Sequence, residues 1–291
     1  MLRIEVISTE RDQLGEGPLW DVDTQALYWI DSHGQAVFRH EGEGRRRRWD
    51  LPERIGSLAL RAGGGAICAL KEGFHTLDFD TGAVTPFATV GATHPRTRLN
   101  DGKVDRRGRF LAGSMDDGET DPLCKLYRLD PDGRVAVLDQ DIICSNGPCW
   151  SGDDRTLYFA DTTRRVIYAY DYAIDTGAVS NRRTFVDFAA LGLPGYPDGA
   201  TVDAAGFVWC CEVYRGRLLR FAPDGTLVRT VGLPVESATS VMFGGPGLDI
   251  AFVTSMARPV GGVSPRESEA GMLFAVHGLG VRGVPEPRFA G

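Results

Sequence analysis

The sequence has few cysteines and no long apolar stretch. Six cysteines in 291 residues are too few for a disulfide scaffold, and Cys144 and Cys149 are too far apart for a redox CxxC pair. No run approaches the roughly 18 apolar residues of a membrane-spanning helix. The first residues, 1–6, lack the long apolar region of a secretory signal. We therefore expect a cytoplasmic protein with reduced thiols and no membrane association.

Positive charge is also in deficit. The chain has 32 Lys and Arg against 39 Asp and Glu, a formal net charge of −7. Nucleic-acid-binding domains are usually basic, so a nucleic-acid partner is not expected. The four arginines at 45–48 are more consistent with a solvated outer strand. The five histidines are scattered along the chain, which argues against a nitrogen–sulfur zinc site, and no GxSxG motif supports a serine nucleophile.

Helical periodicity is scarce, and short β-type runs repeat in a fixed order instead. One run type begins at residues 27, 67, 110, 157, 208 and 251, so its copies are 40, 43, 47, 51 and 43 residues apart. About four strands fit in each period, which is typical of a β-propeller blade. The sequence therefore predicts an all-β, six-bladed propeller with four antiparallel strands per blade. Residues 2–8 should pair with the last blade and close the ring, making 1–291 one domain.

Polar residues recur just before the innermost strand of several blades. Glu16, Asn100, Asn146 and Asp198 lie 12, 10, 12 and 10 residues before equivalent positions of the next strand. Each is also followed by Gly at once or one residue later, so ordinary turns are the alternative interpretation. Their common register instead predicts that all four face one mouth of the central channel. Two carboxylates and two amides gathered there would suit a hard cation such as Ca²⁺, Mg²⁺ or Mn²⁺.

At these residues the sequence resembles the senescence-marker-protein/regucalcin and gluconolactonase family. The matching motifs, in chain order, are Leu14-Gly15-Glu16-Gly17-Pro18, Arg98-Leu99-Asn100-Asp101-Gly102, Gly113-Ser114-Met115, Ser145-Asn146-Gly147-Pro148 and Tyr196-Pro197-Asp198-Gly199. The resemblance covers residues 14 to about 272 and implies a six-bladed propeller acting as a divalent-metal-dependent sugar lactonase.

The resemblance also implies roles for individual residues. Glu16, Asn146 and Asp198 would hold the metal, and Arg98 and Asn100 would contact the substrate. Family members present an acidic residue to substrate hydroxyls just after the Gly-Ser/Thr-Met motif. In this chain either Asp117 or Glu119 is the candidate, and a solvated acidic loop is the alternative for that stretch.

The residue types suit the hydrolysis of a small-molecule sugar lactone. A bound cation acts as a Lewis acid on the carbonyl and lowers the pKa of a bound water, which becomes the nucleophile. Asp198 is the candidate general base, and Arg98 would orient the substrate. The cation could be Ca²⁺, Mg²⁺, Mn²⁺, Fe²⁺ or Zn²⁺. Two alternatives remain open: hydrolysis of another ester or phosphotriester at the same site, and a calcium-binding regulatory or scaffold propeller without turnover.

Overall fold

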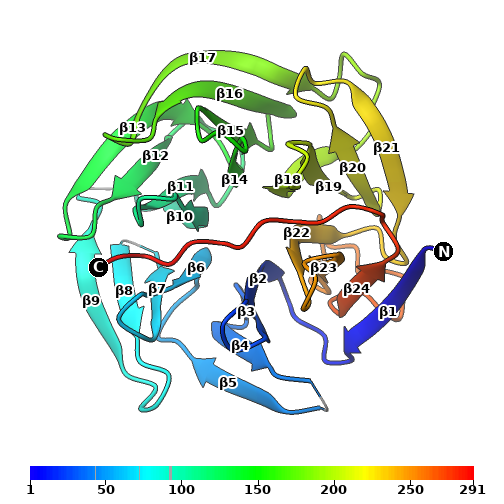
Figure 1. The fold of residues 1–291 in the computed structure, drawn as a ribbon, viewed down its shortest axis with the longest axis horizontal. Helices are drawn as coiled ribbons and strands as arrows, with labels where there is room; N and C mark the ends of the chain where they lie inside the picture. Colours follow the sequence, from blue (N-terminus) through cyan, green and yellow to red (C-terminus); the bar gives the residue numbers. More distant parts are fainter. Residues whose placement is uncertain (43, 72, 92–93) are drawn as a thin grey trace.

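A computed structural model describes residues 1–42, 44–71, 73–91 and 94–291. Among these residues 24 strands form six four-stranded antiparallel sheets, arranged as blades around a central axis (Figure 1). This architecture confirms the predicted six-bladed propeller. The described residues include no helix long and apolar enough to cross a membrane.

Each blade runs from an innermost strand at the axis to an outermost strand at the rim (Figure 1). In that order, the strands are β2 (Gly15–Asp21), β3 (Ala26–Asp31), β4 (Ala36–His40) and β5 (Arg46–Asp50) in blade 1; β6 (Ser57–Leu60), β7 (Ala66–Ala69), β8 (Gly73–Leu77) and β9 (Val84–Thr89) in blade 2; β10 (Thr97–Val104), β11 (Phe110–Asp116), β12 (Cys124–Leu129) and β13 (Val135–Ile142) in blade 3; β14 (Ser145–Trp150), β15 (Thr156–Asp161), β16 (Val166–Ala173) and β17 (Ala178–Asp187) in blade 4; β18 (Tyr196–Val202), β19 (Val208–Val213), β20 (Arg217–Phe221) and β21 (Leu227–Gly232) in blade 5; and β22 (Ala238–Gly244), β23 (Ile250–Ser255), β24 (Leu273–His277) and β1 (Arg3–Ser8) in blade 6.

The ring closes as predicted, because the N-terminal strand completes the last blade. β1 pairs antiparallel with β24, in a register that places Arg3 opposite His277 and Val6 opposite Phe274. In blade 2, β8 ends at Leu77 because a turn follows it. The carboxylate of Asp78 accepts hydrogen bonds from the backbone amides of Asp80 and Thr81, which turns the chain away from the sheet.

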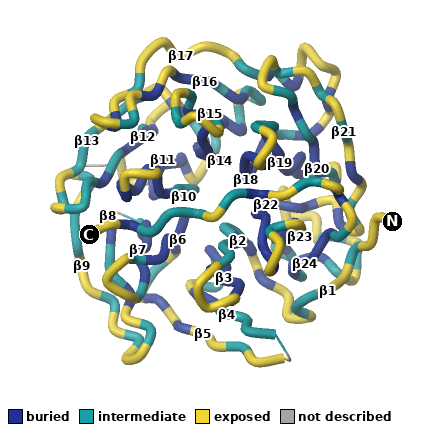
Figure 2. Tube along the Cα trace, in the orientation of Figure 1, coloured by how far each residue is buried: buried dark blue, intermediate teal, exposed yellow. Residues whose placement is uncertain are grey.

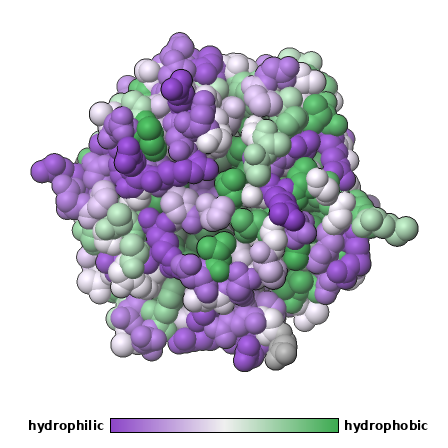
Figure 3. Space-filling view, in the orientation of Figure 1, coloured by the Kyte–Doolittle hydropathy of each residue, from purple (hydrophilic) through white to green (hydrophobic). Residues whose placement is uncertain are grey.

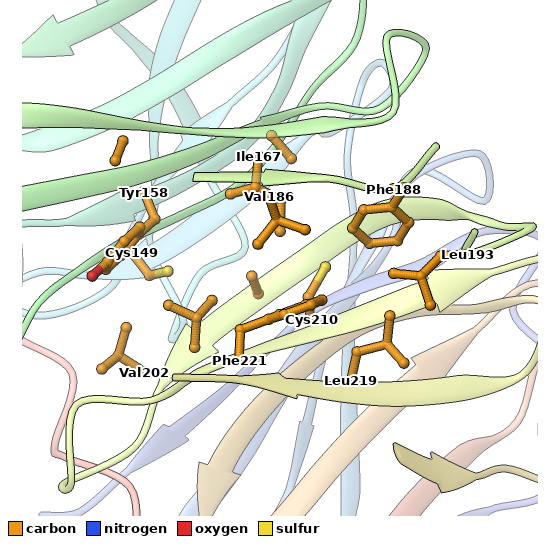
Figure 4. Packing of buried hydrophobic residues seen from close by; sticks show 14 residues of the cluster. Cys149, Tyr158, Ile167, Val186, Phe188, Leu193, Val202, Cys210, Leu219 and Phe221 are labelled. Atoms are coloured by element: carbon orange, nitrogen blue, oxygen red, sulfur yellow. The ribbon is translucent and has the colours of Figure 1, made fainter. Parts of the chain in front are cut away.

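The core lies between neighbouring blades, where apolar side chains of facing sheets interdigitate. Between blades 4 and 5, Tyr158 and Ile167 of one blade and Leu219 and Phe221 of the next contribute to a single buried cluster (Figure 4). All six cysteines are buried and unpaired, which agrees with the reduced thiols expected from the sequence.

A C-terminal segment, residues 278–291, crosses one face of the ring after β24 (Figures 1 and 2). We call it the C-terminal strap; the repeat pattern did not predict it. Its backbone hydrogen-bonds to blades 2, 3 and 5, with contacts at Leu60, Gly108 and Ala204. Phe289 of the strap is fully buried. Hydrophobic residues form only separate patches among hydrophilic ones on this face of the molecule (Figure 3).

The strap also fixes which end of the ring is covered. It contacts residues at or just beyond the C-terminal ends of the innermost strands, such as Leu60 of β6 and Ala204 after β18. The opposite end, at the N-terminal ends of these strands, is where the predicted site residues lie.

Candidate functional site

The innermost strands share an irregularity where the predicted site residues lie. In five of the six, the pairing with the next strand shifts register near the N-terminal end. The shifts fall between Glu16 and Leu19, Leu99 and Gly102, Asn146 and Cys149, Pro197 and Ala200, and Ala238 and Val241. The predicted site residues are therefore inside these strands rather than before them. A β-bulge redirects side chains, so each strand can turn a polar group toward the axis while remaining in its sheet.

Gly147 shows why a glycine follows one of these polar residues. It has a φ of 54°, a region of backbone conformation that favours glycine. A Cβ there would lie 2.8 Å from the Cβ of Ala200 and 2.9 Å from the carbonyl oxygen of Asp198. The glycine thus lets blades 4 and 5 approach closely beside Asn146 and Asp198.

The polar side chains from four blades meet in one cavity of about 420 Å³. Glu16 of blade 1, Arg98 and Asn100 of blade 3, Asn146 of blade 4 and Asp198 of blade 5 all line it. The structure therefore brings together the residues that the sequence placed around one channel mouth.

Hydrogen bonds hold the amide and guanidinium groups of the cavity in a chain. Arg98 Nη1 donates to Asn100 Oδ1 at 2.8 Å. Asn100 Nδ2 in turn donates to Asn146 Oδ1 at 3.2 Å and to the Ser145 carbonyl at 2.8 Å. Asn146 Nδ2 donates to Thr162 Oγ1 at 2.8 Å. The side-chain nitrogen of Asn146 is bonded to Thr162, so the side-chain oxygen of Asn146 points away from Thr162 and toward Asn100.

The two carboxylates have no side-chain hydrogen-bond partner in the part of the chain that the structure describes. Glu16 and Asp198 form no ion pair within the described part of the chain, and Asp198 Oδ1 is buried without a hydrogen-bond partner. Burial raises the pKa of both carboxyls well above the usual range. The proximity of Asp198 and Asp101 raises the pKa of Glu16 further, and that of Asp101 and Glu119 does the same for Asp198. The cavity thus concentrates negative charge that the described protein groups do not balance.

The two candidate acids after Gly113-Ser114-Met115 lie in different places. Glu119 lines the cavity. Asp117 is not among the described lining residues; its Oδ1 lies 3.4 Å from Arg98 Nε and 3.6 Å from Arg54 Nη1. The geometry therefore favours Glu119 as the acid that can reach a ligand, while Asp117 is exposed and lies beside Arg98.

Several lining residues were not predicted from the sequence. Arg258 and Tyr214 reach the cavity from loops after β23 and β19, and Leu14, Met115 and Met256 give it an apolar wall. Tyr214 has a φ of 66°, an unusual backbone conformation for a bulky residue and one that is found at functional sites. The repeat pattern did not predict these loops. Arg258 lies outside the repeat, next to a Gly- and Pro-rich stretch, and this position could have indicated the loop after β23.

Asp101 is a further unpredicted acid, next to Asn100 in β10. Its carboxylate accepts hydrogen bonds from the backbone amides of Gly102 and Gly147, both at 2.8 Å. Burial raises its pKa. Asp101 therefore joins blades 3 and 4 beneath the cavity and adds to its negative charge.

The donor set suits a hard divalent cation. Glu16, Asp198 and the carbonyl oxygen of Asn146 offer oxygen ligands, and the unpartnered Asp198 Oδ1 is a buried acceptor that requires a positive partner. No group of three or more His, Cys, Asp and Glu side chains placed to hold a metal is present in the described ranges, so such a site depends on the amide of Asn146. Cys144 also lines the cavity, but burial raises its pKa well above the usual range, so it is not a thiolate nucleophile.

Comparisons with known proteins agree with this architecture. A sequence profile of the SMP-30/gluconolactonase/LRE-like region matches residues 14–257. Regucalcin from Xenopus laevis is 36% identical over 299 residues, covering 100% of this chain and 99% of its own. Among solved structures, a luciferin-regenerating enzyme has a TM-score of 0.93 and 28% identity, covering 100% of both chains. A structure described as a calcium-binding protein, regucalcin, from Agrobacterium tumefaciens has a TM-score of 0.91 and 26% identity, covering 98% of this chain and 96% of that one.

Proposed function

The chain belongs to the SMP-30/gluconolactonase/LRE-like family, and from this membership and the donor set of its cavity we propose that it is a divalent-cation-dependent lactonase. It hydrolyses a sugar lactone to the corresponding aldonic acid. The observation that carries the proposal is the buried, unpartnered Asp198 Oδ1 in a cavity that also holds Glu16, Asn146 and a buried arginine.

Glu16, Asn146 and Asp198 are the residues that hold the cation in this proposal. A divalent cation bound there would polarise the lactone carbonyl and lower the pKa of a bound water. The carboxylate of Asp198 accepts the proton that the attacking water loses. The proton then passes to the ring oxygen as the ester bond breaks, leaving a hydroxyl and a carboxylic acid, which releases its own proton to solvent and becomes the carboxylate.

Arg98 positions the ester and stabilises the charge that develops on it. Its Nη1 is held by Asn100 Oδ1 and the Leu99 carbonyl, and Asp117 lies beside Nε. No hydrogen bond from Nη2 is found in the described part of the chain, so this group is available to the substrate. Burial makes such a donor more effective than it would be in water. Glu119, on the cavity wall, accepts hydrogen bonds from sugar hydroxyls.

The experiment is an indicator assay of lactone opening, with pentono- and hexonolactones, on metal-stripped protein and after restoring each divalent cation. We expect turnover well above spontaneous hydrolysis only when a cation is restored. Arg98→Gln should lower kcat/KM by about 100-fold or more while cation binding, measured by calorimetry, is retained. Asn146→Ala should lose cation binding itself.

A calcium-binding protein without turnover is the second candidate, favoured by the description of the Agrobacterium tumefaciens structure as calcium-binding. A protein that only binds calcium does not require a buried arginine such as Arg98 next to its cation site. Cation binding with no turnover of any lactone in the panel would overturn the lactonase proposal in favour of this candidate.

A further inference from the structure

Arg258 is a cavity residue that the proposed reaction does not use. It follows β23, and its backbone amide donates to the Gln13 carbonyl at 3.0 Å, which ties its loop to blade 1. Its side chain lines the cavity, and its Nε is buried without a hydrogen-bond partner. In the ranges that the structure describes, it forms no ion pair. The side chain is half-buried, and a buried donor such as its Nε is costly without an acceptor, so an acceptor from outside the protein is the natural partner.

The charges of three arginines, Arg258 among them, act on one imidazole. Burial and the charges of Arg54, Arg258 and Arg98 together lower the pKa of His33 to about 4, so this imidazole is neutral at pH 7. Asp117 lies between Arg54 and Arg98 and offsets their charge. Arg258 forms no such ion pair among the described residues, although its charge lowers the pKa of Glu16 and Asp198 and it shares a neighbouring cavity with Glu236 and Glu267.

The space around Arg258 extends beyond the first cavity. A second cavity of about 440 Å³ shares Tyr214, Arg258 and Val260 with the first and continues past Ser264 and Arg266. Arg258 therefore stands at the junction of the two. A substrate whose ester lies near Asp198 has room to extend a substituent toward Arg258.

We propose that Arg258 is a specificity-determining residue that binds an anionic substituent of the substrate, a carboxylate or a phosphate ester remote from the lactone ring. This inference rests on the proposed lactonase function and names the class of lactone: one that carries its own negative charge. Arginine suits this task because its planar guanidinium can donate two parallel hydrogen bonds to a carboxylate or phosphate.

Three lactones test the inference and distinguish the two anions: a neutral hexono-1,4-lactone, a hexaro-1,4-lactone with a free carboxylate, and a 6-phosphohexono-1,5-lactone. We expect kcat/KM for one charged lactone, relative to its spontaneous hydrolysis, to exceed that for the neutral one by about tenfold or more. Preference for the hexarolactone identifies a carboxylate, and preference for the phosphorylated lactone identifies a phosphate. Equal values for all three would overturn the inference and leave the lactonase proposal intact.

Substitutions assign the preference to Arg258. Arg258→Gln should lower the charged-to-neutral ratio of kcat/KM at least tenfold, mainly through KM, and Arg258→Lys should restore part of it. Arg266→Gln is the matched control, because Arg266 lines only the second cavity. An unchanged ratio in Arg258→Gln, or an equal loss in Arg266→Gln, would overturn the assignment.

A binding measurement separates this inference from the proposed function. Calorimetry compares hexarate, which has two carboxylates, and 6-phosphohexonate, which has a phosphate, with hexonate, on the wild type and on Arg258→Gln. Tighter binding of hexarate or of 6-phosphohexonate that disappears in the variant supports the anion site even if no lactone is hydrolysed. Equal binding of all three ligands by the wild type overturns it.

Discussion

The charged side chains of the C-terminal strap and those of the cavity, at opposite ends of the propeller, differ in how they are paired. At the end covered by the C-terminal strap, Arg288 pairs with Asp21 and Asp23, and Glu286 lies 3.5 Å from Lys103. At the other end, buried polar atoms of Asp198, Arg98 and Arg258 have no hydrogen-bond partner among the described residues. The strap uses its charges to hold the ring together, and the cavity keeps several of its charged groups free for a ligand. Outside the cavity, carboxylates at the same end, such as Asp161 and Glu212, are paired with Arg164 and Arg217.

Two aspartates of blade 5 show this contrast at a separation of five residues. Asp203 accepts hydrogen bonds from the backbone amides of Ala205 and Phe207 and from the side chains of Trp209 and Arg220, at 2.9 to 3.1 Å. Asp198 is also buried, yet its Oδ1 accepts none. Both aspartates are buried, but only Asp203 has its hydrogen bonds satisfied. This difference distinguishes a structural carboxylate from one that is available for chemistry.

The largest expected effect comes from substituting each of these aspartates in turn. Asp198→Ala should lower kcat by about 1,000-fold or more, because it removes both a cation ligand and the proton acceptor. The metal-free variant should be at least as stable as the metal-free wild type, since an unpartnered buried carboxyl is lost. Asp203→Ala should instead lose about 3–5 kcal/mol of unfolding free energy, because Arg220 and Trp209 lose their acceptor.

Urea denaturation and lactone hydrolysis, measured on both variants, check this pair. The contrast between the ends would fail if Asp198→Ala unfolded more readily than Asp203→Ala, or if it kept near-normal activity. Circular dichroism serves as the control that each variant is folded under the assay conditions.

A smaller effect is expected when the strap is loosened. Phe289 is fully buried among blade 2 and blade 3 residues, so Phe289→Ala should cost about 3 kcal/mol of unfolding free energy. The folded variant should keep the wild-type kcat/KM, because the strap lies at the opposite end from the cavity. Phe289→Leu is the matched control and should lose less. A fall in kcat/KM in the folded Phe289→Ala variant would show that the two ends are coupled.

The smallest effects concern the pH dependence of stability, which should have opposite signs at the two ends. Asp12 lies beside the loop that carries Arg258, and burial and the nearby Asp31 raise its pKa to about 7. The unfolded chain releases this proton near pH 3.8, so the carboxyl makes folding less favourable as pH rises from about 4 to 7. Asp12→Asn should therefore stabilise the protein at pH 8, by on the order of 1–2 kcal/mol, and have little effect near pH 3.

Asp21, under the strap, should behave in the opposite way. Burial alone would raise its pKa, but hydrogen bonds from Thr24 and the Asp23 amide and the charge of Arg288 lower it overall. A lowered pKa stabilises the fold above the pKa of the unfolded chain, and this stability is lost as pH falls. Asp21→Asn should thus destabilise the protein at pH 7 and progressively less below pH 4. Thermal unfolding across this pH range measures both variants, and the same sign for both would contradict the comparison.

The sequence predicted the regular parts of the molecule and missed the irregular ones. The repeat located all six blades, and its register placed Glu16, Asn100, Asn146 and Asp198 at one level because equivalent positions of repeated strands face the same axis. The strap and Arg258 belong to segments without periodicity. Their positions depend on contacts that form only when the ring is closed, such as the bond between Arg258 and Gln13, which are 245 residues apart in sequence.

The pairing of β1 with β24 also sets an order of events during biosynthesis. β1 leaves the ribosome before every other strand of the ring, yet its partner residues in β24 are 265 to 274 positions further along the chain. At about 5–20 residues per second, the nascent chain waits roughly 13–50 s before the ring can close. Until then blade 6 is incomplete and its sheet edge is open to other chains. Ring closure, and with it the approach of Arg258 to the cavity, is therefore among the last events in the making of this protein.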